Sequence, residues 1–91
     1  MDIKAIRARI DAVDEQMAAL FEERLGLVYQ VAEYKYETGG KIFDAAREDE
    51  VVAKNCARIV NPDYREAYTT FIHMVMDQSK NVQKQYIEAQ K

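Results

Sequence analysis

Apolar residues recur at alternating steps of three and four over the first third of the chain, the spacing of one helix face. This apolar seam consists of Ile3, Ile6, Ile10, Val13, Met17, Leu20, Leu27 and Val31. It contains no proline and a single glycine, Gly26. Gly39-Gly40 supplies a stop signal, because the residue that follows a helix is often a glycine in the left-handed conformation. The pattern predicts one long helix over about 2–38.

Two shorter helices are predicted in the rest of the chain. Asp44 is a good N-cap for a helix that runs to about Ile59 or Val60. The apolar side of this helix consists of Val51, Val52, Cys56 and Ile59. Asn61-Pro62-Asp63 then offers a cap, a proline at the first helical position and an acid in the first turn, which start a third helix that continues to about Ala89. The prediction is an all-α chain of three helices, forming a single domain over 1–91.

The length of the first helix has a consequence for assembly. At about 1.5 Å per residue it forms a rod on the order of 54 Å long. A compact domain of this size has a radius of gyration of about 12 Å, so the rod extends beyond the rest of the chain. Because the apolar seam continues almost to both ends of the rod, we expect two chains to wrap their long helices around each other as an intertwined homodimer.

Basic residues interrupt or flank the apolar seam. Arg24 occupies a seam position between Leu20 and Leu27, where a guanidinium is costly unless an anion or carboxylate compensates it. Lys35 is eleven residues further on and shares the same helix face, while Arg7 flanks the seam near its other end. Taken singly, each is explained by a cation that reaches solvent or forms an internal ion pair.

The second and third helices carry polar residues at comparable positions. Ser79 and Gln83 fall within the apolar side of the third helix, one turn apart, so that both side chains can touch the same object. Asp44, Arg47 and Glu48 share one face where the second helix begins. Hydrogen-bonded core residues and helix capping with a local ion pair are the simpler explanations for these two groups.

Composition narrows the class of protein. Hydrophobic residues make up 48% of the chain and charged residues 32%, which is typical of a globular protein, and the net charge of −3 disfavours a nucleic-acid partner. No apolar run of roughly 18 residues is present to span a membrane. The single cysteine, Cys56, and the lack of a signal-peptide pattern favour a cytoplasmic location. No nucleophile–base pair stands out, which disfavours catalysis through a covalent intermediate.

Together, these residues resemble the motifs of the all-helical chorismate mutases, the AroQ class. The resemblance rests on Arg7-Ala-Arg-Ile-Asp-Ala-Val-Asp14 followed by Leu20 and Arg24, on Lys35, on Asp44-Ala-Ala-Arg47-Glu48, and on Ser79-x-x-x-Gln83. Eight positions are in register over 77 residues, from Arg7 to Gln83. None of the eight departs from the family pattern.

The resemblance implies a homodimer with two equivalent sites that convert chorismate to prephenate, a branch step towards phenylalanine and tyrosine, with no metal or other cofactor. Arg7 of the partner chain and Arg24 would bind the carboxylates with help from Ser79. Lys35 and Gln83 would donate hydrogen bonds to the breaking ether oxygen. Three further residues would complete the site. Glu48, with Asp44, would receive the ring hydroxyl, and Arg47 would close the charged wall.

Two other functions are compatible with parts of this pattern. Isochorismate pyruvate-lyases look similar in the first helix but, as a resemblance, lack the Asp-x-x-Arg-Glu sequence at the second. A helical dimerisation module without catalysis predicts that Arg24, Lys35 and Gln83 find protein partners and leave no cavity. An activity assay on chorismate and isochorismate distinguishes a mutase from a lyase. The presence or absence of a cavity distinguishes an enzyme from a non-catalytic module.

Overall fold

The computed structural model describes residues 1–91 and contains one very long helix, α1, over Ile3–Thr38. The side chain of Asp2 accepts hydrogen bonds from the backbone N–H groups of Lys4 and Ala5, which caps the first turn. Gly39 ends the helix with φ 71°, and its N–H bonds to the carbonyl oxygen of Lys35. Both predicted ends of the first helix are therefore confirmed.

The second helix, α2, spans Ala45–Ala57 and ends two or three residues earlier than predicted. Its predicted cap, Asp44, accepts a hydrogen bond from the backbone N–H of Arg47. After Ala57 the chain tightens into a turn in which the N–H of Arg58 bonds to the carbonyl of Asn55. The N–H of Ile59 bonds in the same way to the carbonyl of Cys56, so Ile59 follows the apolar spacing but lies in this turn rather than in the helix.

The third helix is preceded by a separate 3₁₀ turn. This turn, η1, spans Pro62–Tyr64 and is capped by Asn61, whose side chain accepts from the N–H of Asp63. The helix α3 then runs over Arg65–Ala89, so its predicted end is confirmed. The predicted start at Asn61-Pro62-Asp63 is confirmed, although the first turn after Asn61 is a 3₁₀ turn rather than part of the α-helix.

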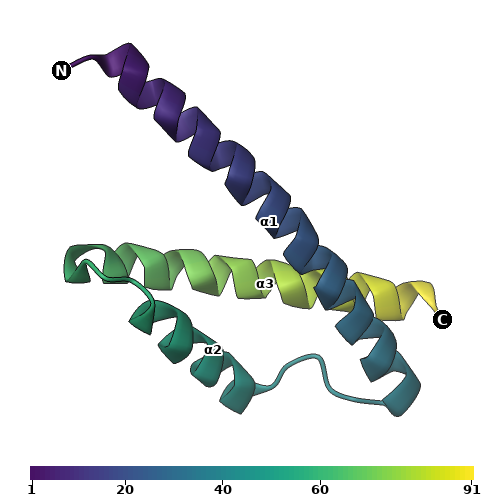
Figure 1. Ribbon diagram of the computed structural model, residues 1–91. Helices are drawn as coiled ribbons and strands as arrows, with labels where there is room; N and C mark the ends of the chain where they lie inside the picture. The colour runs from purple at the N-terminus through teal and green to yellow at the C-terminus, as the bar shows by residue number, and fades with distance from the viewer.

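The three helices form an open arrangement in which α3 packs against both α1 and α2 (Figure 1). The N-terminal half of α1 extends away from the other two helices. The chain measures 55 × 25 × 14 Å and has a radius of gyration of 16.4 Å, well above the value of about 12 Å for a compact domain of this length. None of the helices has a segment long and apolar enough to cross a membrane.

The buried core is small for a chain of this length. Its buried apolar residues are Ala32, Ile72, Val75 and Met76. The side of α1 that loses its exposure to solvent is the row Leu25, Val28 and Ala32, which lies beside the predicted seam. Most of the seam itself stays exposed within one chain, with Leu20 at 63% and Leu27 at 55%. Within a single chain, the seam therefore lacks the helical partner that its pattern predicts.

Candidate functional site

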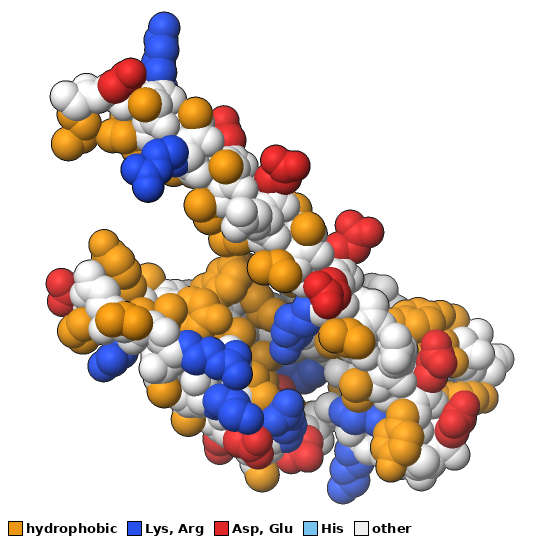
Figure 2. All heavy atoms as spheres, in the orientation of Figure 1, with side chains coloured by type: hydrophobic (Ala, Val, Ile, Leu, Met, Phe, Trp, Pro, Cys, Tyr) orange, Lys and Arg blue, Asp and Glu red, His pale blue; other side chains and the backbone are white.

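A pocket of about 160 Å³ lies where the C-terminal half of α1, the start of α2 and the middle of α3 meet. Lys and Arg side chains gather on both sides of the hollow between α1 and α2 in Figure 2. Seven of the eight candidate residues line this pocket, namely Arg24, Lys35, Asp44, Arg47, Glu48, Ser79 and Gln83. The eighth, Arg7, is on the extended half of α1 and does not line it. The chain thus brings together residues that are up to 59 positions apart in the sequence.

Arg24 links α1 to α3 through a hydrogen bond that its Nη1 donates to the hydroxyl of Ser79. Ser79 is buried, with 7% of its surface exposed, and its hydroxyl in turn donates to the carbonyl of Val75 at 2.9 Å. The serine is therefore fully engaged by its own helix and by Arg24. The guanidinium is directed across the interface by a neutral group, so its positive charge is not compensated there.

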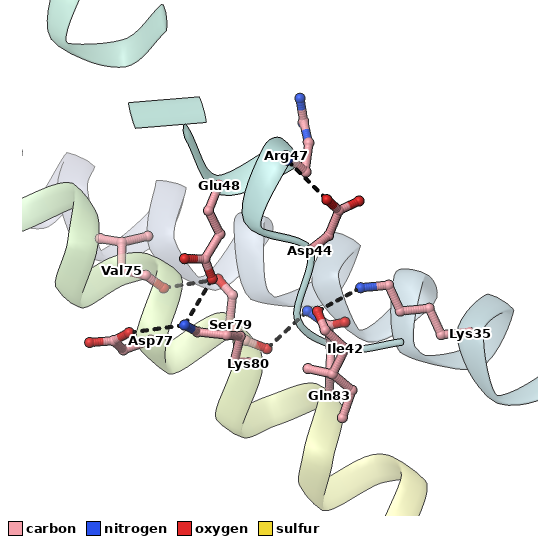
Figure 3. Close-up of polar contacts among 10 residues, drawn as sticks. All are labelled: Lys35, Ile42, Asp44, Arg47, Glu48, Val75, Asp77, Ser79, Lys80 and Gln83. Carbon is pink, nitrogen blue, oxygen red and sulfur yellow. Dashed lines mark hydrogen bonds and ion pairs between the residues drawn. The ribbon is translucent and has the colours of Figure 1, made fainter. Parts of the chain in front are cut away.

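Lys35 directs its ammonium group towards the segment that joins α1 to α2. Its Nζ donates to the backbone carbonyl of Ile42 at 3.0 Å (Figure 3). Like Arg24, it has no carboxylate within ion-pair distance, since the ion pairs of the chain join other residues. Two half-buried cations thus line one pocket and make hydrogen bonds only to neutral oxygens.

Gln83 brings a buried amide to the same pocket. Only 7% of the residue is exposed, and its Nε2 donates to the carbonyl of Ser79 at 3.3 Å. Its Oε1 is buried and has no hydrogen-bond partner. The Nε2 group has a second hydrogen, so the amide offers one free donor and one unpaired acceptor. Most buried polar groups are satisfied, and an unpaired one at a pocket wall indicates a place where a ligand can bind.

The start of α2 supplies groups of both charges. Asp44 caps the helix, whereas Arg47 turns outward and its Nη1 pairs with Glu50 at 3.0 Å, both side chains being 61% exposed. In Figure 3 the end of Arg47 points away from the other labelled residues. Glu48 points towards α3 and is only 22% exposed. Of the acidic side chains at this corner, Glu48 is thus the one held against another helix.

Lys80 is a pocket residue that the sequence interpretation missed. Its Nζ lies 2.8 Å from Oε1 of Glu48 and 3.4 Å from Oδ1 of Asp77. The hydrogen bond to Glu48 is the largest influence on the pKa of Lys80 and raises it above the usual 10.5. A signal was available, since Lys80 directly follows Ser79 and stands three residues after Asp77, but a single lysine in a helix is commonplace.

The pocket as a whole carries an excess of positive charge. Its lining includes four cationic side chains, Arg24, Lys35, Arg47 and Lys80, and two acidic ones, Asp44 and Glu48. The formal balance is therefore +2. A small, three-helix pocket with cations, a neutral amide donor and one fixed carboxylate is suited to bind a small multiply charged anion that also bears a hydroxyl group.

The comparison with protein families agrees with this class of site. The model of the family Chorismate mutase type II matches residues 6–84, which is most of the chain. The chain belongs to this family. No curated protein and no solved structure matched the chain in the other two comparisons.

Proposed function

We propose that the chain catalyses the rearrangement of chorismate to prephenate in this pocket. Membership of the chorismate mutase family supports the activity in general. The observation that carries the proposal is the pair Arg24 and Lys35, two half-buried cations on one wall that have no carboxylate partner. Chorismate is a dicarboxylate, and its two negative charges match the +2 balance of the pocket lining.

The reaction requires positioning and charge stabilisation rather than a nucleophile. It is intramolecular, so the site has to hold the substrate in a compact chair and stabilise the negative charge that develops on the breaking ether oxygen. In the proposed arrangement Lys35 and Gln83 donate to that oxygen. Lys35 exchanges its bond to the Ile42 carbonyl for this contact, and Gln83 uses its free amide hydrogen.

The remaining groups bind the ends of the substrate. Arg24, held in direction by Ser79, binds a carboxylate, and Glu48 accepts the ring hydroxyl with Asp44 beside it. Arg47 closes the charged wall once its guanidinium turns from Glu50 towards the pocket, a movement that its exposure permits at little cost.

A non-catalytic helical module explains these contacts less well. Such a module predicts that the polar residues find protein partners and leave no cavity. Arg24, Lys35 and Gln83 do have partners, but all three partners are neutral oxygens, and the residues still surround an open pocket. Cations without counter-charges are a poor structural choice, since apolar residues would stabilise the same interface better.

We further propose that the active form is an intertwined homodimer. A folded monomer of this mass exposes about 5,500 Å², whereas this chain exposes 7339 Å². The excess in two chains falls within the range of obligate interfaces, on the order of 2,000–5,000 Å². An apolar groove between α1 and α3, lined by Met17, Phe21, Phe71 and Met74 among others, offers a surface for the second chain. Pairing of the long helices would bring Arg7 of one chain to the pocket of the other.

The decisive experiment is an assay of the purified protein on chorismate and, separately, on isochorismate. We expect chorismate to disappear with formation of prephenate and isochorismate to release no pyruvate. The variant Lys35→Met should lose most of the activity, about 100-fold or more, because it removes a donor to the developing charge. Pyruvate release from isochorismate, or an inactive wild-type protein that is folded and dimeric, would contradict the proposal.

A further inference from the structure

Lys80 makes the one ion pair that joins two of the helices around the pocket. Its Nζ is 2.8 Å from Oε1 of Glu48 on α2, while the other ion pairs connect residues within a single helix. The same ammonium group lies 5.1 Å from the centre of the Phe43 ring, just before α2 begins. Lys80 thus connects α3 both to the start of α2 and to the segment that precedes it.

The pair is more sheltered than the other ion pairs in the chain. Lys80 and Glu48 are 29% and 22% exposed, whereas Asp77, the other carboxylate near Lys80, is 67% exposed. Figure 3 shows Glu48 and Lys80 directed towards each other from α2 and α3. Since exposed pairs contribute little, Glu48 is the partner that determines where the ammonium group lies.

We infer that Lys80 is a positioning residue of the site, which holds Oε1 of Glu48 and leaves Oε2 to accept the hydroxyl group of the substrate. The inference rests on the proposed function. An ionised carboxylate accepts hydrogen bonds at both oxygens, and such charge-assisted bonds are stronger than neutral ones. Lys80 therefore fixes the direction of the Glu48 carboxylate through one oxygen and leaves the other free for the substrate.

Among the charged groups around Glu48, Lys80 is the one that forms an ion pair with it. The charged groups that line the pocket with Glu48 are Arg24 and Lys35 from α1, Asp44 and Arg47 from the start of α2, and Lys80 from α3, with Asp77 behind Lys80. Of these, only Lys80 pairs with Glu48. Removal of Lys80 takes away the one positive charge that pairs with Glu48 and leaves its carboxylate free to turn.

Four variants test the inference. Lys80→Met and Lys80→Gln remove the charge, Lys80→Arg keeps it, and Lys84→Met removes a charge from an exposed position on the same helix. We expect Lys80→Met and Lys80→Gln to lower kcat/KM about 10- to 100-fold near neutral pH. Lys80→Arg should recover much of this loss, and Lys84→Met should resemble the wild type.

A double-mutant cycle and rescue by Lys80→Arg distinguish positioning from a merely structural role. In a Glu48→Gln background, Lys80→Gln should cost little more kcat/KM, since its partner has already lost its charge. Losses of kcat/KM that add independently, no rescue by Lys80→Arg, or a Lys80→Gln variant as active as Lys84→Met would overturn the inference.

A second measurement does not depend on catalysis. The free energy of unfolding of the wild type, Lys80→Gln, Glu48→Gln and the double variant, measured by chemical denaturation, should show that the two substitutions are coupled. Effects that add independently refute the role of Lys80 whether or not the protein rearranges chorismate. An inactive wild-type protein with the expected coupling refutes the proposed function and leaves the Lys80–Glu48 coupling established.

Discussion

The side-chain amide of Gln83 is held in place by one hydrogen bond but still has groups that can bind a ligand. Its Nε2 is tied to the Ser79 carbonyl of its own helix, which fixes the direction of the amide, while Oε1 is buried without a partner. A buried acceptor without a hydrogen bond costs about 1–3 kcal/mol. A ligand or a cation that donates a hydrogen bond to Oε1 would remove this cost.

The proposed donor role of Gln83 predicts a pH-dependent variant. A glutamate at this position has nearly the same shape but donates a hydrogen bond only when protonated. When ionised, it repels both the Ser79 carbonyl and the oxygen that gains negative charge in the reaction. We expect Gln83→Glu to be impaired near neutral pH and to recover as the pH falls through the pKa of the new carboxyl, which burial raises.

The measurement is kcat/KM from about pH 4.5 to 8 for Gln83→Glu and for the wild type. The wild-type amide does not titrate, so its profile should show no gain on the acid side. Parallel profiles for the two proteins would mean that Gln83 does not contact the reacting oxygen.

Tyr86 belongs to an aromatic cluster that joins α1 to α3 away from the pocket. Its ring centre lies 4.8 Å from that of Tyr29 and 6.3 Å from that of Tyr36, both in edge-on geometry. Desolvation raises the pKa of Tyr86 above its usual 10.0, and the acidic side chains of Glu33 and Glu37 add to the shift. The phenol is thus favoured in its neutral form in the folded chain.

This shift predicts a loss of stability in alkali. Above about pH 10 the unfolded chain releases the phenolic proton while the folded chain retains it, so the free energy of unfolding falls as the pH rises. The raised pKa of Lys80 acts in the same direction above 10.5. Chemical denaturation between about pH 9 and 11 should show a shallower decline for Tyr86→Phe than for the wild type. Tyr64→Phe, at a ring that is 64% exposed, is the matched control and should keep the wild-type slope.

At the scale of the helices, local signals predicted the ends more reliably than the packing. Asp44 and Gly39 act on their own neighbours through caps, so their positions in the sequence were sufficient. The end of α2 was placed too late because Ile59 continues the apolar spacing but lies in the turn that follows the helix. A helix end marked by a capping residue can be predicted from the sequence, whereas an end without such a residue is harder to place.

The sequence pattern did not indicate which row of α1 packs within its own chain. The periodicity gave one seam, yet α3 covers the neighbouring row Leu25, Val28 and Ala32. The two rows overlap on the helix surface, and spacing alone does not say which one meets the chain's own helix. Lys80 was missed for a related reason, because its partner Glu48 lies on another helix, 32 residues away.

Asp44 has two roles that substitutions can separate, one as the cap of α2 and one in the proposed site. As the N-cap of α2 it stabilises the helix, and in the proposed site it stands beside Glu48. Asp44→Ala should lower the stability by about 1 kcal/mol, whereas asparagine is as good a cap and Asp44→Asn should retain most of it. Both should reduce kcat/KM, by about tenfold for Asp44→Asn. Full activity of the Asp44→Asn protein would mean that Asp44 caps the helix and has no role in the site.

At the scale of the whole molecule, the N-terminal half of α1 extends away from the other helices, and nothing within one chain covers its apolar residues. Seam residues such as Ile10, Val13 and Leu20 are 52%, 53% and 63% exposed, although isolated apolar rows of this length are rare on monomeric proteins. The seam predicted from the sequence thus finds its use in the proposed dimer rather than in the single chain. Arg7 belongs to the same half, about 25 Å along the helix from Arg24.

The distance between Arg7 and Arg24 leads to a prediction about mixtures of two inactive variants. If Arg7 of one chain completes the pocket that contains Arg24 of the other, Arg7→Ala and Arg24→Ala homodimers should each be nearly inactive. When the two variants are unfolded together and refolded as a mixture, each heterodimer has one site with both arginines and one site with neither. Activity per protein should then recover to about a quarter of the wild-type value, since about half of the dimers are mixed and each has one intact site.

Differently tagged chains allow the heterodimers to be isolated and counted before the assay. A mixture made without unfolding is the control, and it should stay inactive for as long as the intertwined chains do not exchange. Recovery requires the two arginines to come from different chains, because any site that drew both from one chain would lack one of them in every pairing. Isolated heterodimers that remain as inactive as the parent variants would therefore exclude the shared site.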